Sequence, residues 1–124
     1  MNPRDPKPAV AQEPSGAWLV REGKVLASIE IPATRKARAR GLLGRTEVEG
    51  AMLLRGVRSV HTLGQRFHLD VALLDEEGVV IKMLRLKRNR MSAPVMRARA
   101  VIEAEAGAFG QWGLQIGDVL EIRE

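Results

Sequence analysis

Both histidines of the chain lie in one polar stretch that runs from Ser59 to Asp70. His61 and His68 stand seven residues apart, and Asp70 follows His68 by two. In an extended segment, residues i and i+2 share a face, so His68 and Asp70 would point together. A turn at Gly64 would bring His61 to the same place. An imidazole beside a carboxylate is held in one tautomer, which suits a general base or a metal ligand. The stretch therefore predicts a cluster that contacts a ligand, with hydrogen bonding to the loop backbone as the structural alternative.

The sequence gives little support to a metal centre or a cofactor. Two histidines and one aspartate lack the spacing of a helical His-Glu-x-x-His site, and the chain has no third imidazole. With no cysteine, it has no thiolate nucleophile, no disulfide and no cysteine zinc site. We therefore predict no metal and no cofactor.

Serine hydrolysis and phosphate-loop chemistry are also poorly supported. Ser59 would lie on the same face of a strand as His61, but no serine of the chain occupies a nucleophile elbow. The segment from Gly41 to Arg45 has two glycines without the Gly-Lys-Ser/Thr that completes a phosphate-binding loop. We therefore assign no catalytic residue, and binding ranks above catalysis.

Two runs of basic residues point to an anionic partner. Seven positive residues and no acid lie between Lys82 and Arg99, and five more lie between Arg35 and Arg45. The net charge of +5 favours encounters with nucleotides, nucleic acid or other anions. Single-stranded nucleic acid is weakly supported, because stacking needs exposed rings and only 3% of the residues are aromatic. The predicted ligand-binding residues are His61, Thr62, Gln65, His68, Asp70, Arg88 and Arg90.

Three functions stay open at this point. The first is a non-enzymatic binding module for a small or anionic ligand. The second is a hydrolase or metal-assisted enzyme that uses His61, His68 and Asp70. The third is a protein that binds a partner or nucleic acid through its basic surface, including an Arg-rich helix over 35–43.

Alternating apolar residues and turn signals predict a mainly β fold. Residues 24–31 alternate with the period of a half-buried strand, and Pro32 would end that ladder. Thr34 suits the N-cap of a short helix over Arg35 to Leu43 that Gly41 or Gly44 would end, and Gly78 suits a hairpin turn. We expect a small β-sandwich or distorted barrel of about seven short strands with one short helix. The predicted strands span 17–21, 24–31, 51–54, 69–74, 79–86, 99–105 and 118–122.

The length of 124 residues suits one domain. Residues 1–16 hold four prolines and no apolar run, which predicts a flexible tail ahead of a single β-rich domain over 17–124. No segment is apolar enough for a membrane span, so we expect a cytoplasmic protein.

Five segments of the chain, taken in order, carry a family pattern: Gly41-Leu42-Leu43-Gly44-Arg45, Ala51-Met52-Leu53-Leu54, His61 to Asp70, Val101 to Gly107, and Trp112 to Asp118. Together they resemble the family called domain of unknown function 192. The likeness covers roughly residues 24–122, and it implies a compact, sandwich-like β fold without implying an activity, cofactor or catalytic residue. His68 stands where the family usually has proline, and Leu63 and Gln65 replace a phenylalanine and a methionine.

Overall fold

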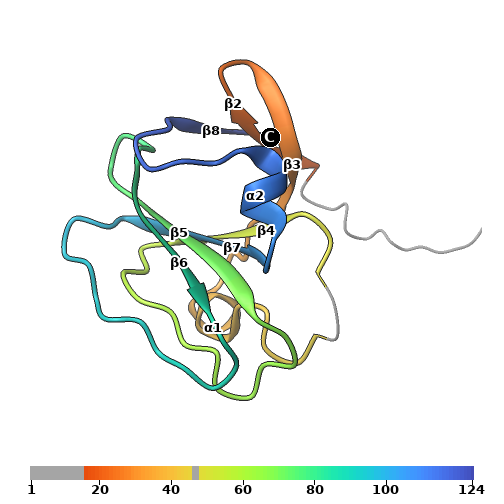
Figure 1. Ribbon diagram of the computed structural model, residues 1–124, viewed down its shortest axis with the longest axis vertical. Coiled ribbons are helices and arrows are strands. Elements are labelled where there is room, and N and C mark those ends of the chain that lie inside the picture. Colours follow the sequence, from red (N-terminus) through yellow and green to blue (C-terminus); the bar gives the residue numbers. More distant parts are fainter. Residues whose placement is uncertain (1–15, 46–47) are drawn as a thin grey trace, which may run out of the picture.

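The computed structural model describes residues 16–45 and 48–124, and Figure 1 shows how its elements are arranged. In chain order they are β2 (Ala17–Arg21), β3 (Lys24–Glu30), α1 (Arg35–Arg40), β4 (Ala51–Arg55), β5 (Leu69–Leu74), β6 (Val80–Leu86), β7 (Ala100–Glu105), α2 (Ala108–Trp112) and β8 (Leu120–Arg123). The predicted tail lies outside the described residues except for Gly16.

The seven strands form one mixed sheet in the order β6-β5-β7-β4-β3-β2-β8. Neighbours pair antiparallel except β3 and β4, which are parallel and are joined by the crossover that contains α1. The two outer strands approach each other where β6 begins, through a bridge between Val79 and Val119 and a bond from the N–H of Leu120 to the carbonyl of Gly78 (2.9 Å). The sheet therefore curls strongly without closing.

Apolar side chains fill both faces of this curled sheet. In β5, Ala72 and Leu74 belong to a core that also holds Phe109 of α2. Leu69 and Val71 point to the other face, where a second core includes Leu42, just after α1. Because alternate side chains of a strand point to opposite faces, β5 can be buried along its whole length. Figure 1 shows α1 and α2 well apart on the sheet.

The residues on either side of α1 determine where this helix begins and ends. The hydroxyl of Thr34 accepts a hydrogen bond from the N–H of Ala37 (3.0 Å), as an N-cap residue does. Gly41 follows the last helical residue with a φ of 54° and donates to the carbonyl of Ala37 (3.0 Å). The helix thus ends at Arg40 rather than at Leu43, because Gly41, the first of the two glycines predicted to end it, turns the chain.

The mainly β class and the seven strands are confirmed. The seven strands form a single open sheet rather than two stacked ones, and the segment around Phe109 makes a second short helix, α2. Among the described residues, neither helix has the length and apolar character needed to cross a membrane.

Candidate functional site

A carboxyl group is buried in the middle of the sheet. Glu103 lies on β7, where it is in register with Met52 of β4 and Val71 of β5. Its side chain is only 3% exposed, and both neighbours belong to the apolar core on the α1 side of the sheet. An ionised carboxylate in such surroundings is costly unless it is fully hydrogen-bonded.

Hydrogen bonds compensate the cost of burying the Glu103 carboxylate only in part. A backbone hydrogen bond from Leu42 favours the charged form, but burial outweighs it and raises the pKa of Glu103 to about 7. Oε1 has no hydrogen-bond partner in the part of the chain that the structure describes. At neutral pH the group is therefore poised between a neutral acid, which donates a hydrogen bond, and a carboxylate, which accepts one.

The chain after α1 passes directly over this carboxyl. A Cβ at Gly41 would stand 3.0 Å from Oε1 of Glu103. Because Gly41 also has a φ of 54°, its backbone is one that residues with a side chain rarely adopt. Two features therefore favour glycine at position 41: the positive φ of its backbone and the short distance from this backbone to the carboxyl of Glu103.

His61 lies beside Glu103 in a hollow of about 180 Å³ between α1 and residues 57–61. Nδ1 of His61 is buried and, like Oε1 of Glu103, has no partner among the described residues. Buried polar atoms are nearly always hydrogen-bonded, so two unpaired ones in a single hollow are unusual. Ser59 and Gly41 line the same hollow.

Two arginines of α1 complete the walls of this hollow, Arg38 and Arg40. Arg38 donates to the carbonyl of Ala33 (3.3 Å), and Arg40 donates to the carbonyl of Leu43 (3.2 Å). Neither makes an ion pair with a described residue. The guanidinium groups therefore keep donors available for an anion.

Asp70, predicted to join the histidines, holds α2 in place. Its Oδ2 accepts from the N–H of Gly107 (2.9 Å) and of Phe109 (3.1 Å), at the start of α2. Its Oδ1 accepts from Nε of Arg85 (3.0 Å). Asp70 is 4% exposed and lies on the face of β5 that carries Ala72, whereas Glu103 lies on the other face of the sheet. The sheet therefore separates the carboxylate of Asp70 from the hollow that holds His61.

The other predicted residues of this stretch mostly contact backbone. Thr62 is buried, and its hydroxyl donates to the carbonyl of Lys87 (2.6 Å) and accepts from the N–H of Arg90 (2.8 Å). His68 is exposed, and its Nδ1 accepts from the N–H of Arg88 (3.1 Å). The side chains of Arg88 and Arg90 are exposed.

Gln65 forms hydrogen bonds with the backbone of the segment that follows α1. With its amide nitrogen turned toward Leu42, it donates to the carbonyl of Leu42 (3.3 Å) and accepts from the N–H of Leu43 (3.0 Å). Leu42 also forms the backbone hydrogen bond to Glu103. Three segments that carry the family resemblance therefore meet at Leu42.

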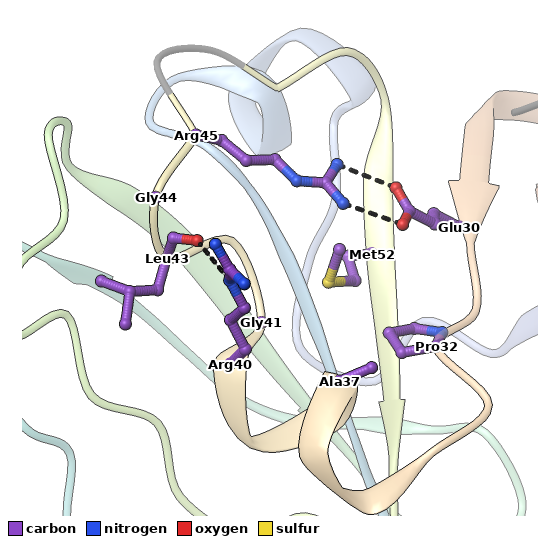
Figure 2. A pocket seen from close by; sticks show the side chains of 9 residues that line it. All are labelled: Glu30, Pro32, Ala37, Arg40, Gly41, Leu43, Gly44, Arg45 and Met52. Carbon is purple, nitrogen blue, oxygen red and sulfur yellow. Dashed lines mark hydrogen bonds and ion pairs between the residues drawn. The ribbon is translucent and has the colours of Figure 1, made fainter. Parts of the chain in front are cut away.

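A second hollow of about 340 Å³ lies on the other side of Arg40 and Gly41 (Figure 2). Arg45 faces Glu30 across it, and two bonds of 2.9 Å join the guanidinium to the carboxylate. Arg45 and Glu30 therefore already pair with each other. Among the described lining residues, no buried side-chain atom is left unpaired. We therefore place the candidate site in the hollow of His61 and Glu103.

The sequence interpretation did not single out Glu103 as a site residue. The available signal was one acidic residue within an apolar strand, Val101-Ile102-Glu103-Ala104. A strand with both faces buried leaves such a residue no route to solvent.

Comparisons with known proteins agree with this fold. The model of the family domain of unknown function 192, described as an uncharacterized ACR, matches residues 18–122, and the chain belongs to this family. No curated protein matches the chain.

Two solved structures are similar to this one. The first is a protein of unknown function from Novosphingobium aromaticivorans, with 20% identity, a TM-score of 0.69, and coverage of 85% of this chain and 82% of that one. The second is described as a candidate transcription regulator from Sinorhizobium meliloti, with 21% identity, a TM-score of 0.68, and coverage of 85% and 90%. At such identities the likeness shows the fold.

Proposed function

We propose that this protein is a non-enzymatic binding module for a small anionic molecule, held in the hollow of His61 and Glu103. The observation that carries the proposal is that two residues lining one hollow, His61 and Glu103, each carry a buried side-chain atom without a hydrogen-bond partner among the described residues, Nδ1 and Oε1. A ligand whose hydrogen-bonding groups reached both atoms would satisfy them. A few polar groups that converge in a partly apolar hollow are typical of small-molecule sites.

The charges around the hollow favour an anion. Arg38 and Arg40 line it and have no acidic partner among the described residues. Glu103, the acid in the hollow, is neutral below a pH of about 7 and then offers a hydrogen-bond donor. The net charge of +5 would raise the rate of encounter with an anion.

Most of the remaining predicted site residues fit a supporting role. Thr62 and Gln65 fix backbone on either side of His61, and they would hold the walls of the hollow in place. Arg88 and Arg90 are exposed on the loop that pairs with His61 through Met91, where they would attract the ligand. His68 and Asp70 are not among the residues that line the hollow, and we assign them no part in this site.

The geometry supports binding over hydrolysis. Ser59 lines the hollow together with His61 and Glu103, which are the residue types of a serine triad. A triad needs the imidazole to be oriented by the acid, yet Nδ1 of His61 has no partner in the described structure. Without that orientation, Ser59 has no general base.

Titration calorimetry would test the proposal with acetate, benzoate, inorganic phosphate, phosphorylated sugars and nucleotides. We expect at least one of these anions to bind, and His61→Ala or Arg38→Ser to weaken binding by about tenfold or more, the cost of a lost hydrogen bond to a charged group. His68→Ala is the matched control, because this second histidine is exposed outside the hollow. Absence of heat with every anion, or equal affinity in all variants, would overturn the proposal.

A further inference from the structure

The loop between β6 and β7 carries an unusual surface. It covers residues 87–99, and no acidic residue occurs anywhere between Gly78 and Ile102. It is longer than most connections in compact domains, and long ordered loops are commonly functional.

This loop is held in a fixed shape by backbone hydrogen bonds to residues 58–62. The N–H of Thr62 donates to the carbonyl of Arg90 (2.7 Å), and the N–H of Ser92 donates to the carbonyl of Val60 (2.8 Å). Farther along, Val95 donates to the carbonyl of Arg58 (3.0 Å). Side chains on the outside of the loop are therefore presented from a preorganised backbone, which lowers the entropy lost on binding.

Apolar side chains project from this loop into solvent. Met96 is 73% exposed and Met91 is 71% exposed, the two largest values among the described large apolar residues. Leu63, in the segment that pairs with the loop, is 49% exposed. Exposed apolar side chains gathered on one ordered region, rather than scattered singly, mark interaction sites.

Several arginines lie near these apolar residues along the chain, and their charges are uncompensated. None of them forms an ion pair with another residue that the structure describes. Arginine binds carboxylates strongly, because its guanidinium group can donate hydrogen bonds to both carboxylate oxygens at once. The arginines of the loop and its partner segment are Arg58, Arg88, Arg90, Arg97 and Arg99.

We propose that the outer side of this loop, the surface of Leu63, Arg88, Arg90, Met91, Met96 and Arg97, docks an acidic segment of another protein. Apolar side chains of that segment would cover Met91 and Met96, and its carboxylates would pair with the flanking arginines. The positive charge of this surface favours an acidic partner. The exposed methionines favour a partner that also presents apolar side chains. This surface shares Arg88 and Arg90 with the proposed approach of the anion, but it includes none of the residues that line the hollow of His61 and Glu103.

The composition favours a protein partner over nucleic acid. Methionine and arginine are enriched at protein interfaces and lysine is depleted, and the loop has four arginines and one lysine. Single strands need aromatic rings to stack on, yet Trp18 lies on β2, and Phe109 and Trp112 lie on α2. Phe67 is half-buried.

A random 15-residue peptide library selected on the immobilised full-length protein would test this surface. We expect the enriched peptides to be rich in Asp and Glu with interspersed Leu, Met or Phe. The best one, labelled with fluorescein, would then be titrated against the variants by anisotropy. The double variant Met91→Ser/Met96→Ser should weaken binding by about tenfold or more, and Arg88→Ser/Arg97→Ser should do the same.

Matched controls lie elsewhere on the molecule. Ile116→Ser removes an apolar side chain that is 64% exposed after α2, and Lys24→Ser removes an exposed charge at the β2–β3 turn. Both should leave the peptide affinity unchanged. Enrichment of peptides without acidic residues, or equal affinity in all four variants, would overturn the proposal. A single-stranded oligonucleotide that displaces the peptide and binds more tightly than it would assign the surface to nucleic acid instead.

Discussion

Gly41 lies directly over Glu103, with Oε1 of the carboxyl 3.0 Å from the position that a Cβ would take at Gly41. This contact joins the end of α1 to the middle of the sheet. It explains why a helix of six residues with no buried side chain of its own stays in place. Leu42 lies two residues after the last residue of the helix. It is fully buried, and its backbone forms a hydrogen bond with Glu103.

Gly41→Ala should destabilise the protein by about 2–3 kcal/mol, because the new methyl group meets the carboxyl and the backbone has a positive φ. Gly56→Ala is the matched control, since Gly56 has a φ of 77° with nothing within 4 Å of the added carbon. Urea unfolding of both variants gives the comparison. If the two lose equal stability, the contact with Glu103 contributes nothing.

Stability should fall as the pH rises from about 4.5 to about 7, because of Glu103. Burial raises the pKa of Glu103 from 4.5 to about 7, so between these values the unfolded chain releases a proton that the folded chain keeps. The unfolded state then binds fewer protons, and the free energy of unfolding decreases with pH, by about 3 kcal/mol in total. Below a pH of about 4.5 the protonated Glu103 makes its full contribution to the free energy of unfolding.

Glu103→Gln isolates that effect, because glutamine has a similar shape and no titration. Urea unfolding across the window should show a flatter pH profile for the variant than for the wild type. Parallel profiles in the two proteins would mean that Glu103 titrates in the folded protein much as it does in the unfolded chain.

Asp70→Ala should cost about 2–3 kcal/mol of stability, because it removes a charged acceptor of three hydrogen bonds, two from the start of α2 and one from Arg85. His68→Ala should cost less than about 1 kcal/mol, since this side chain is exposed and accepts one bond. Thermal unfolding would rank the two. Anion binding by folded Asp70→Ala protein should match the wild type, and a complete loss would place Asp70 in the ligand site.

Local features of the fold could be predicted from the sequence. Pro32 lies just beyond the end of β3, Thr34 caps α1, and Gly78 has a φ of 84° in the β5–β6 hairpin. Each of these depends on the conformational preference of one residue and its neighbours, which a single sequence displays. The same holds for the positions of the seven strands. The predicted alternation fails at the start of β3, where Val25 is 58% exposed and Leu26 packs against the core.

The candidate site could not be predicted in the same way. Gly41, His61 and Glu103 are far apart in sequence, and they meet only because β7 pairs with β4 while the end of α1 covers the sheet. The polar stretch from Ser59 to Asp70 contributes His61 to the hollow, whereas Asp70 lies on the opposite face. Closeness along the chain could not reveal on which side of the sheet each side chain falls, because that depends on register.

The anion should bind beside a neutral Glu103, so its affinity should depend on the protonation of that carboxyl. We would measure the affinity by calorimetry against pH, for the tightest of the five kinds of anion, with the wild type and with Glu103→Gln. His61 is common to both proteins, so the ratio of the wild-type affinity to the variant affinity isolates Glu103. We expect this ratio to fall by about tenfold for each pH unit above a pKa of about 7, as the wild-type carboxylate comes to repel the anion. A ratio that stays constant across this range, or an affinity of the wild type that rises with pH, would mean that the anion does not bind beside a neutral Glu103.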